Sequence, residues 1–265
     1  MSEKTIDSRW RLDGMNAVVT GATKGIGRAV AEELARLGAS VGIVARNADE
    51  VEQTVTALRL AGFDAWGCAA DVSKPEGRDA VVAAMPDGWE RLDILVNNAG
   101  MNIRKRALEY DDDEIERIFK TNLSSAFKLS RTMHGRLVLS GRASVVFVGS
   151  VAGLTTTGTG AIYAMTKAAM GHLGRVLAVE WARDQIRVNT IAPWYTRTPL
   201  AEPVLANPVY LERILARTPI GRIAEPSEIA TAVAFLCMPA ASYVTGQILS
   251  VDGGFTAYGY SPEPL

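Results

Sequence analysis

The chain has 265 residues, of which 48% are hydrophobic and 22% charged, and its 28 basic and 29 acidic side chains leave a formal net charge of −1. This composition excludes a disordered chain, and the charge balance gives no electrostatic attraction to nucleic acid or to an anionic membrane. No apolar run reaches the roughly 20 residues of a membrane span, and we see no secretion signal, so we expect a soluble cytoplasmic protein. Cys68 and Cys237 lack metal-ligand spacing, so we expect two buried cysteines and no metal site.

Short apolar runs alternate along the chain with longer amphipathic stretches. The apolar runs predict strands at 15–20, 40–45, 64–70, 92–96, 144–148, 186–191 and 247–251. Helical spacing predicts helices at 26–37, 75–85, 112–139, 161–183 and 225–238, and another that begins after Asn47, where Glu50 completes a capping box. This alternation predicts a single α/β domain, residues 1–265, with a doubly wound parallel sheet. A barrel is disfavoured, because it needs about eight strand–helix repeats.

A glycine-rich turn follows the first predicted strand. Gly21, Gly25 and Gly27 fall within T-G-A-T-K-G-I-G, and the next helix opens at the last of them. Glycines permit a tight turn and a close approach of the backbone, and a helix N-terminus presents free N–H groups to a pyrophosphate. The turn therefore indicates a dinucleotide site, although it also suits a plain connection between a strand and a helix.

The end of the second predicted strand indicates which dinucleotide binds. A site for NAD places Asp or Glu about 20 residues after the glycines, to accept a hydrogen bond from the ribose hydroxyl. Here Arg46 follows the strand, and its guanidinium suits the 2′-phosphate of NADP(H), with Lys24 as a second positive charge nearby. Asp49 and Glu50 lie further along, where acids favour a helix start. We therefore predict NADP(H), with a solvated arginine as the alternative interpretation.

Three residues further along suggest acid–base chemistry. Ser150 follows the strand at 144–148, and Tyr163 and Lys167 lie one turn apart on the next predicted helix. A phenol has a pKa of about 10, and a neighbouring cation lowers that pKa. A serine at the carboxyl end of a strand can donate to a substrate's carbonyl oxygen. Asn122 lies inside the helix at 112–139, and taken by itself it is interpreted as a surface amide.

Together these residues resemble the short-chain dehydrogenase/reductase family over nearly the whole chain. Residues 20–27 match its glycine motif, 97–100 its N-N-A-G motif, and 252–254 its C-terminal signature. Within the family, the segments 9–14, 178–189 and 233–252 look like tropinone reductase-like enzymes. Trp194 stands where the wider family has glycine, and this substitution resembles a variant found in the tropinone reductase-like group. Its bulky ring would narrow the substrate pocket.

The resemblance implies a Rossmann-type fold, a homotetramer built through the helices at 112–139 and 161–183, and a lid over the substrate at 199–222. It implies a catalytic tetrad in which Tyr163 protonates the developing alkoxide and Ser150 orients the carbonyl. Lys167 would lower the pKa of Tyr163 and hold the nicotinamide ribose, and Asn122 would anchor a water. The implied cofactor contacts are Gly21, Thr23, Lys24, Gly25, Ile26, Gly27, Arg46, Asp71, Val72, Asn98, Ala99, Gly100, Tyr163, Lys167, Pro193, Thr196 and Thr198.

Three functions stay open on the sequence. The first is an NADPH-dependent reductase of a small ketone, similar to tropinone reductase in family but not necessarily in substrate. The second is a 3-oxoacyl-[acyl-carrier-protein] reductase, which needs a basic docking patch near the pocket mouth. The third is a non-catalytic protein that senses NADP, against which the intact tetrad argues. The basic run at 103–106 suits an anionic substrate better than an ammonium, with a solvated surface run as the alternative.

Overall fold

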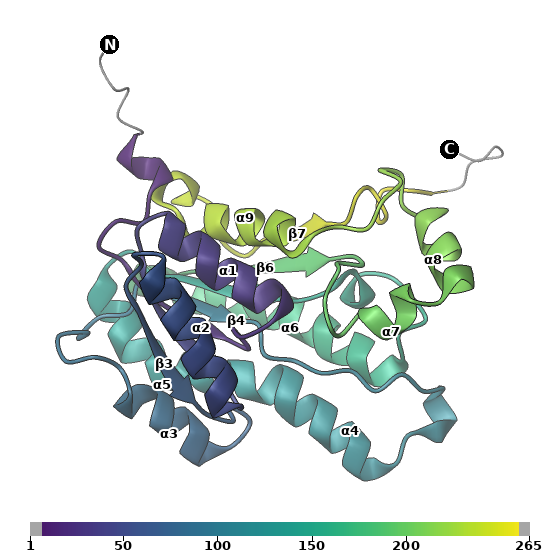
Figure 1. Ribbon diagram of the computed structural model, residues 1–265, viewed down its shortest axis with the longest axis horizontal. Helices are drawn as coiled ribbons and strands as arrows, with labels where there is room; N and C mark the ends of the chain where they lie inside the picture. The colour runs from purple at the N-terminus through teal and green to yellow at the C-terminus, as the bar shows by residue number, and fades with distance from the viewer. Residues whose placement is uncertain (1–6, 260–265) are drawn as a thin grey trace.

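The computed structural model describes residues 7–259, and within them the strands form one seven-stranded, entirely parallel sheet. The strand order is β3-β2-β1-β4-β5-β6-β7, so the chain winds outward from β1 first in one direction and then in the other (Figure 1). This confirms the doubly wound sheet. The strands are β1 (Asn16–Thr20), β2 (Ser40–Ala45), β3 (Ala65–Ala69), β4 (Ile94–Asn97), β5 (Ser144–Val148), β6 (Arg187–Pro193) and β7 (Ile248–Val251).

Helices cover both faces of the sheet, because strand residues alternate between two buried sides. Val19 and Val146 belong to a cluster with α1 (Gly25–Arg36), α2 (Ala48–Leu60) and α9 (Pro226–Cys237). Val18 and Phe147 belong to a second cluster on the opposite face. The helices of that second face are α3 (Pro75–Ala83), α5 (Ser125–Ser140) and α6 (Ala161–Glu180). Cys68 and Cys237 are buried and unpaired, as expected.

The start of α2 differs in part from the prediction. Asn47 does cap the helix, since its Oδ1 accepts a hydrogen bond of 3.1 Å from the Glu50 N–H. The predicted capping box is wrong, because the Glu50 carboxylate turns toward the glycine turn. It lies 2.7 Å from the ammonium of Lys24 and accepts a hydrogen bond of 3.1 Å from the hydroxyl of Thr23. A charged donor is a stronger partner than the backbone N–H of Asn47.

The predicted helical region at 112–139 is confirmed, but it is not a single α-helix. A π turn at Lys120–Ser124 separates α4 (Asp112–Phe119) from α5. Asn122 lies in this turn and is fully buried, which corrects its interpretation as a surface amide. The π turn adds a residue to the helical turn, and such turns concentrate at functional sites. The amide of Asn122 bonds to both backbone groups of Met101, at 2.8 and 2.9 Å.

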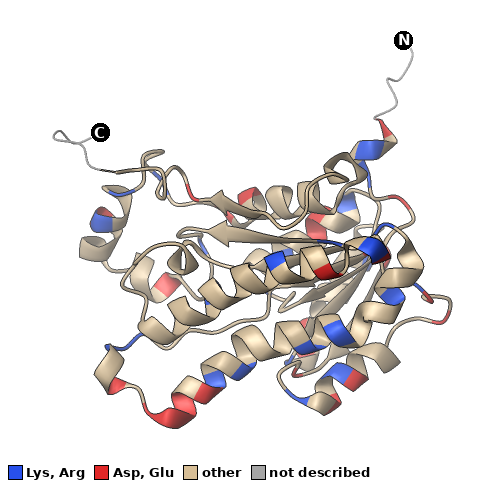
Figure 2. Ribbon diagram, turned by 180° about the vertical axis from the view of Figure 1, so that it is seen from behind, with Lys and Arg blue, Asp and Glu red and all other residues tan. Residues whose placement is uncertain are grey.

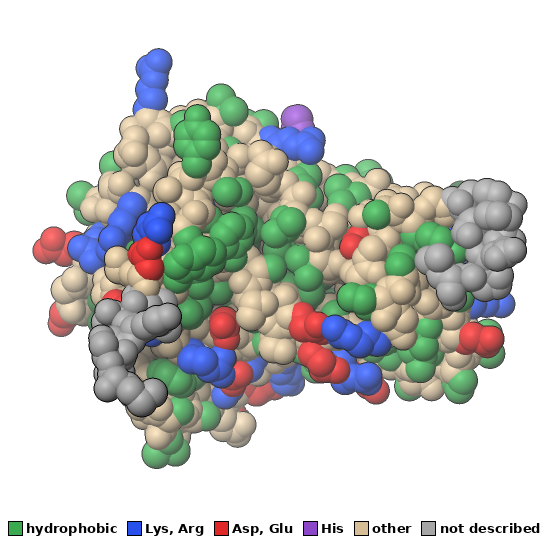
Figure 3. Space-filling view, turned by 90° about the horizontal axis from the view of Figure 1, so that it is seen from above, with side chains coloured by type: hydrophobic (Ala, Val, Ile, Leu, Met, Phe, Trp, Pro, Cys, Tyr) green, Lys and Arg blue, Asp and Glu red, His purple; other side chains and the backbone are tan. Residues whose placement is uncertain are grey.

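The predicted lid at 199–222 contains two short helices, α7 (Glu202–Leu205) and α8 (Pro208–Leu215). They pack on each other through their own apolar cluster, with Leu205 and Ile214 at its centre. Figure 1 shows both helices at one end of the molecule, beyond β6. Figure 3 looks onto the face over α1 and α9, where basic and acidic side chains are interspersed. Among the described helices, none is long and apolar enough to cross a membrane.

Two glycines of α5 should respond to alanine in opposite directions. Gly135 is exposed inside the helix and Gly141 ends it at φ 67°, and an added Cβ meets nothing within 4 Å at either position. Gly135→Ala should stabilise the fold by about 0.5–1 kcal/mol, because it reduces the backbone entropy lost on folding. Gly141→Ala should destabilise it by about 1 kcal/mol, because the left-handed conformation crowds a Cβ. Thermal unfolding measures both, and shifts of the same sign would contradict this helix end.

Candidate active site

Two cavities meet along the carboxyl ends of the strands, where open parallel sheets bind their ligands. One, of about 740 Å³, lies beside β1, β2 and β3 and is lined by the glycine turn, Arg46 and Asp71. The other, of about 150 Å³, lies beyond β5 and β6 and is lined by Ser150 and Tyr163. Both include Gly100 and Met101, so they form one continuous cleft. We call them the dinucleotide cavity and the catalytic cavity.

Close packing fixes the glycine turn at the end of β1. Gly21 and Gly25 have φ of 64° and 54°, which L side chains rarely adopt. A Cβ at Gly27 would overlap the carbonyl oxygen of Gly21 and the side chain of Asn98. The Asn98 amide donates to the carbonyl oxygens of Thr20 and Gly21, at 3.0 and 3.1 Å. Asn98, predicted as a cofactor contact, therefore also holds the turn in place.

These residues fit the phosphate groups of a dinucleotide. The N-cap of α1 is Lys24, whose side chain makes no capping hydrogen bond. The first N–H groups of α1 and the positive end of its dipole are thus left for an anion. The helix opens at Gly25, two residues before the predicted start at Gly27, which is buried against Gly21 and Asn98. Thr23, Lys24, Ala99 and Gly100 line the same cavity.

The charges at the far end of the dinucleotide cavity differ from the prediction at one position. Arg46 is exposed and has no carboxylate partner among residues 7–259. Lys24 pairs with Glu50, so it does not supply a second unmatched charge. Burial opposes the ionisation of Asp71, but hydrogen bonds from Ser73 and the charge of Arg46 together hold its pKa below its usual value. Val72 is buried beside it and lines the same cavity.

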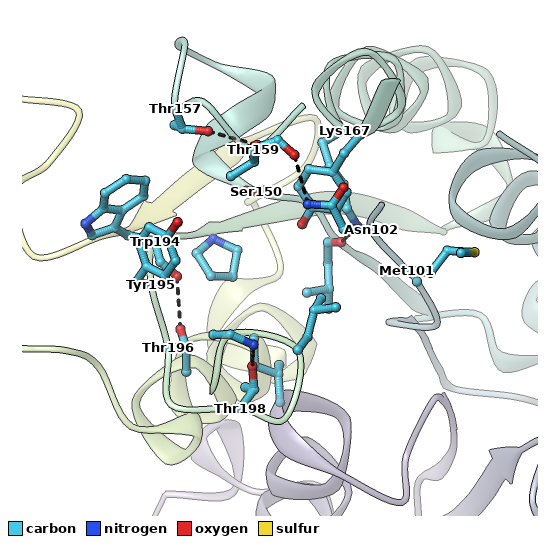
Figure 4. Close-up of a pocket in the computed structure, with 18 of the residues that line it drawn as sticks. Met101, Asn102, Ser150, Thr157, Thr159, Lys167, Trp194, Tyr195, Thr196 and Thr198 are labelled. Carbon is cyan, nitrogen blue, oxygen red and sulfur yellow. Dashed lines mark hydrogen bonds between the residues drawn. The ribbon is translucent and has the colours of Figure 1, made fainter. Parts of the chain in front are cut away.

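The catalytic cavity brings together Ser150, Tyr163 and Lys167, which come from the end of β5 and from α6. Figure 4 shows Ser150 and Lys167 at this cavity. The Ser150 hydroxyl accepts a hydrogen bond of 3.1 Å from the N–H of Ala152, which leaves its own proton free to donate. The Nζ of Lys167 is 5.6 Å from the centre of the Tyr163 ring and donates to the carbonyl oxygen of Val148 at 2.7 Å.

Burial dominates the ionisation of this pair. It raises the pKa of Tyr163, while hydrogen bonding by Ser150 and the charge of Arg104 act in the opposite direction. It also lowers the pKa of Lys167 to about 8. The tyrosine therefore holds its proton at neutral pH, as a proton donor must. The lysine is charged at neutral pH, and burying that charge costs folding free energy.

Asn122 and Gly100 lie beside this pair. A Cβ at Gly100 would be 3.4 Å from the Oδ1 of Asn122 and 3.7 Å from the Nζ of Lys167. The Nδ2 of Asn122 also donates to the hydroxyl of Thr166 at 3.3 Å. Asn122 thus ties the segment after β4 to α6 one residue before Lys167. Its expected role in anchoring a water stays a prediction.

Aromatic rings form the opposite wall of the catalytic cavity. The Trp194 ring stacks on Phe255 with 3.7 Å between centres, and Tyr195 meets it edge-on at 4.7 Å. The Nε1 of Trp194 donates to the hydroxyl of Thr218 at 3.0 Å. Figure 4 shows Trp194 and Tyr195 across the cavity from Ser150 and Lys167. The ring is thus a fixed part of the pocket wall, on the side of the lid segment.

The remaining predicted contacts lie on the same segment or on α1. Pro193, Thr196 and Thr198 line the catalytic cavity, as does Ile26 of α1. The Thr196 hydroxyl donates to the carbonyl oxygen of Trp194 at 3.1 Å, and the Thr198 hydroxyl accepts from the N–H of Ala201 at 3.3 Å. The methyl group of Thr198 lies against Gly25, which brings this segment to the glycine turn.

Sequence reasoning missed several residues of the cavity. Asn102 lines it with a buried Oδ1 that has no hydrogen-bond partner in the described chain, so this oxygen can accept from a ligand. Thr159, whose carbonyl oxygen accepts from Asn102 at 3.0 Å, lies in the loop before α6. Tyr195 was missed as well, and its position beside Trp194 was the available signal. Arg104 was not missed, because it belongs to the basic run predicted to suit an anionic substrate, and it does line the cavity.

The comparisons with known proteins agree with this geometry. A family model described as enoyl-(acyl carrier protein) reductase matches residues 21–256. A tropinone reductase homolog of Arabidopsis thaliana is 46% identical over 256 residues, which is 96% of this chain and 97% of that protein. The chain belongs to the short-chain dehydrogenase/reductase family. This confirms the resemblance of its sequence motifs.

Solved structures of the family are similar throughout. A gluconate 5-dehydrogenase from Burkholderia cenocepacia, in complex with NADP and tartrate, is 32% identical with a TM-score of 0.90, covering 95% of this chain and 99% of that chain. A 7α-hydroxysteroid dehydrogenase, in complex with NADH and 7-oxo glycochenodeoxycholic acid, is 35% identical with a TM-score of 0.89, covering 94% and 98%. These relatives hold different dinucleotides, so the choice of cofactor depends on this chain's own residues.

The buried charge of Lys167 should cost folding stability. Its pKa falls from 10.5 to about 8, a shift equivalent to about 3 kcal/mol. The lysine is charged in both states below pH 8, so the full cost applies there. The cost declines as the pH rises from about 8 to 10.5, where only the unfolded chain binds the proton.

Lys167→Met should therefore raise the free energy of unfolding at pH 7 by about 2 kcal/mol, after about 1 kcal/mol is lost with the hydrogen bond to Val148. This gain should shrink at pH 10. Urea unfolding at both pH values measures it, with the exposed Lys128→Met of α5 as the control. A variant that is less stable than the wild type at pH 7 would show that burial does not penalise this charge.

Proposed function

We propose that this protein is an NADPH-dependent carbonyl reductase that converts a ketone to a secondary alcohol, reversibly. Its family membership makes it an oxidoreductase of alcohol and carbonyl groups. The observation that carries the proposal is the meeting of Ser150, Tyr163 and Lys167 at one cavity that is continuous with the glycine turn. A non-catalytic sensor has no need of a proton donor, an oriented hydroxyl and a buried cation at one point.

The residues would divide the work as follows. When bound, the reduced nicotinamide supplies the hydride that forms the new C–H bond at the carbonyl carbon. Tyr163 gives its proton to the carbonyl oxygen, which becomes the alcohol hydroxyl. Ser150 donates a hydrogen bond to the same oxygen as its negative charge develops. Lys167 stabilises the phenolate that results, because its positive charge offsets the cost of burying that anion.

The choice of NADP(H) is supported by the charge at the end of β2. Arg46 is the residue there, and no acidic side chain takes the position that would accept from a ribose hydroxyl. Its guanidinium reaches the cavity without a carboxylate partner among the described residues. A phosphate on the ribose would pair with it through charge-assisted hydrogen bonds. The family structure with NADP bound is consistent with this choice.

We also infer that the chain assembles into a homotetramer through α5 and α6. Large apolar side chains stand out on these helices, with Val179 79% exposed, Leu139 66% and Met165 53%. Contact with other copies of the chain would remove these apolar side chains from water, which is favourable. The helices at 112–139 and 161–183, predicted as the contact, correspond to this region.

Tyr163→Phe should remove carbonyl reduction while the fold and the cofactor site persist. The ring remains, but no group is left to protonate the oxygen, so kcat should fall about a thousandfold. NADPH oxidation with a panel of cyclic ketones measures this, and NADPH fluorescence confirms that the cofactor still binds. The control is Tyr243→Phe, which removes a hydroxyl from a fully exposed ring. Reduction at wild-type rate by Tyr163→Phe would disprove the proposal.

Arg46→Ala should weaken the preference for NADPH over NADH without affecting the chemical step. Loss of a charge-assisted contact to the phosphate should lower kcat/KM for NADPH about 10- to 100-fold, with little change for NADH. Steady-state rates with the two cofactors give this ratio. Arg142→Ala is the matched control, because Arg142 is exposed just before β5, at the amino ends of the strands and away from the cavities. An unchanged ratio in Arg46→Ala would contradict the assigned role of Arg46.

A further inference from the structure

A second, larger cavity adjoins the catalytic one. Its volume is about 860 Å³, against about 150 Å³ for the catalytic cavity. Both are lined by Arg104, Thr157, Trp194 and Tyr195, so the two are continuous at these side chains. We call the larger cavity the basic recess. The small catalytic cavity has room for the reacting part of a substrate, and the rest of the molecule would extend into the recess.

The lining of the basic recess is strongly positive. Its basic residues are Arg104, Lys105, Arg106, Arg213 and Arg217. Lys105 is paired with Glu114 at 2.7 Å. Within residues 7–259, Glu109 is the one acidic residue of the lining, and no arginine of the lining forms an ion pair. The recess therefore keeps four guanidinium charges that the described chain does not neutralise.

These charges come from segments that are far apart in the sequence. Arg104 and Arg106 follow β4, whereas Arg213 lies on α8 and Arg217 just after it. Figure 2 shows basic residues of both segments at the same end of the molecule, where the lid helices lie. The acidic residues at the start of α4 are near this end too, but they do not line the recess. Gathering like charges costs free energy unless an anion compensates it.

Two of the arginines have positions that suit ligand binding. The guanidinium of Arg217 lies over the Tyr258 ring, 4.8 Å from its centre, where a cation–π interaction stabilises it. Arg104 stands between the two cavities, and its guanidinium contacts the carbonyl oxygen of Leu200 at 3.4 Å. Burial raises the pKa of both Tyr163 and Tyr195, and the charge of Arg104 opposes that rise, so Arg104 acts within electrostatic reach of the reacting oxygen.

We propose that the physiological substrate is a carbonyl compound with an anionic group, a carboxylate or a phosphate, which the arginines of the basic recess bind while the carbonyl reaches Ser150 and Tyr163. The inference rests on the proposed function and adds the substrate class to it. Arg104, Arg213 and Arg217 would bind this anionic group together, because all three line the recess. An amine substrate, which is positive at neutral pH, would be repelled by the same charges.

The test compares ketones that share one ring and differ in charge. An oxocyclohexanecarboxylate, its methyl ester, the phosphate ester of a hydroxycyclohexanone and the matching aminoketone are each reduced with NADPH. At least one anion should exceed the ester in kcat/KM by about tenfold or more. The aminoketone should be the poorest substrate, and the advantage of the anion should fall as salt is raised. The ratio of carboxylate to phosphate identifies which anion the recess prefers.

Variants then assign the effect to the recess. Arg213→Gln combined with Arg217→Gln should lower the anion-to-ester ratio of kcat/KM about tenfold, chiefly through KM. Arg183→Gln is the matched control. Arg183 is exposed on the turn after α6, at the opposite edge of the sheet, and its loss changes the net charge without touching the recess. Its anion-to-ester ratio should stay within about twofold of wild type.

The outcomes separate this inference from the proposed function. Reduction of acid and ester with equal kcat/KM would overturn the anionic substrate and leave the reductase in place. If no ketone is reduced, the reductase fails, and binding decides the inference instead. In calorimetry with NADPH present, cyclohexanecarboxylate should then bind more tightly than its methyl ester, and the double variant should lose the difference. Equal affinities in that measurement would overturn the inference.

Discussion

The site depends on the close approach of four residues where β1 and β4 end side by side and α1 begins. Asn98 donates to the carbonyl oxygens of Thr20 and Gly21, and Gly27 packs against both Gly21 and Asn98 with no room for a Cβ. This contact bends the chain sharply out of the sheet and points the first turn of α1 at the cleft. The dinucleotide cavity exists because these atoms pack so tightly. The strand order places it at the point where the sheet's winding reverses.

The second constraint is a charge held in the protein interior. Lys167 is buried against the end of β5, with the Val148 carbonyl oxygen as its protein partner. A fold selected for stability alone would place an apolar side chain here. The same burial raises the pKa of Tyr163, so the phenol keeps its proton, while the lysine beside it offers compensation when that proton leaves. Folding stability and chemistry thus compete at one side chain.

The near-zero net charge conceals a strongly uneven distribution. Arg46 lies at one end of the continuous cleft, and the arginines of the basic recess lie at the other, while Lys24 and Lys105 are matched by carboxylates. A cofactor phosphate and a substrate anion would therefore meet separate positive regions. The catalytic cavity lies between them, with aromatic side chains on one wall and the buried charge of Lys167 on the other.

The sequence by itself determined the sheet, the positions of most helices, the glycine turn and the Ser150, Tyr163 and Lys167 set. Apolar periodicity and turn chemistry act over a few residues, so they can be read locally. Only the tertiary structure decided that Glu50 pairs with Lys24, that a π turn buries Asn122, and that Arg104 joins Arg213 and Arg217 in one recess. These features depend on which distant segments become neighbours in the fold. The spacing of residues along the chain does not predict which charged side chains a distant segment will bring into contact.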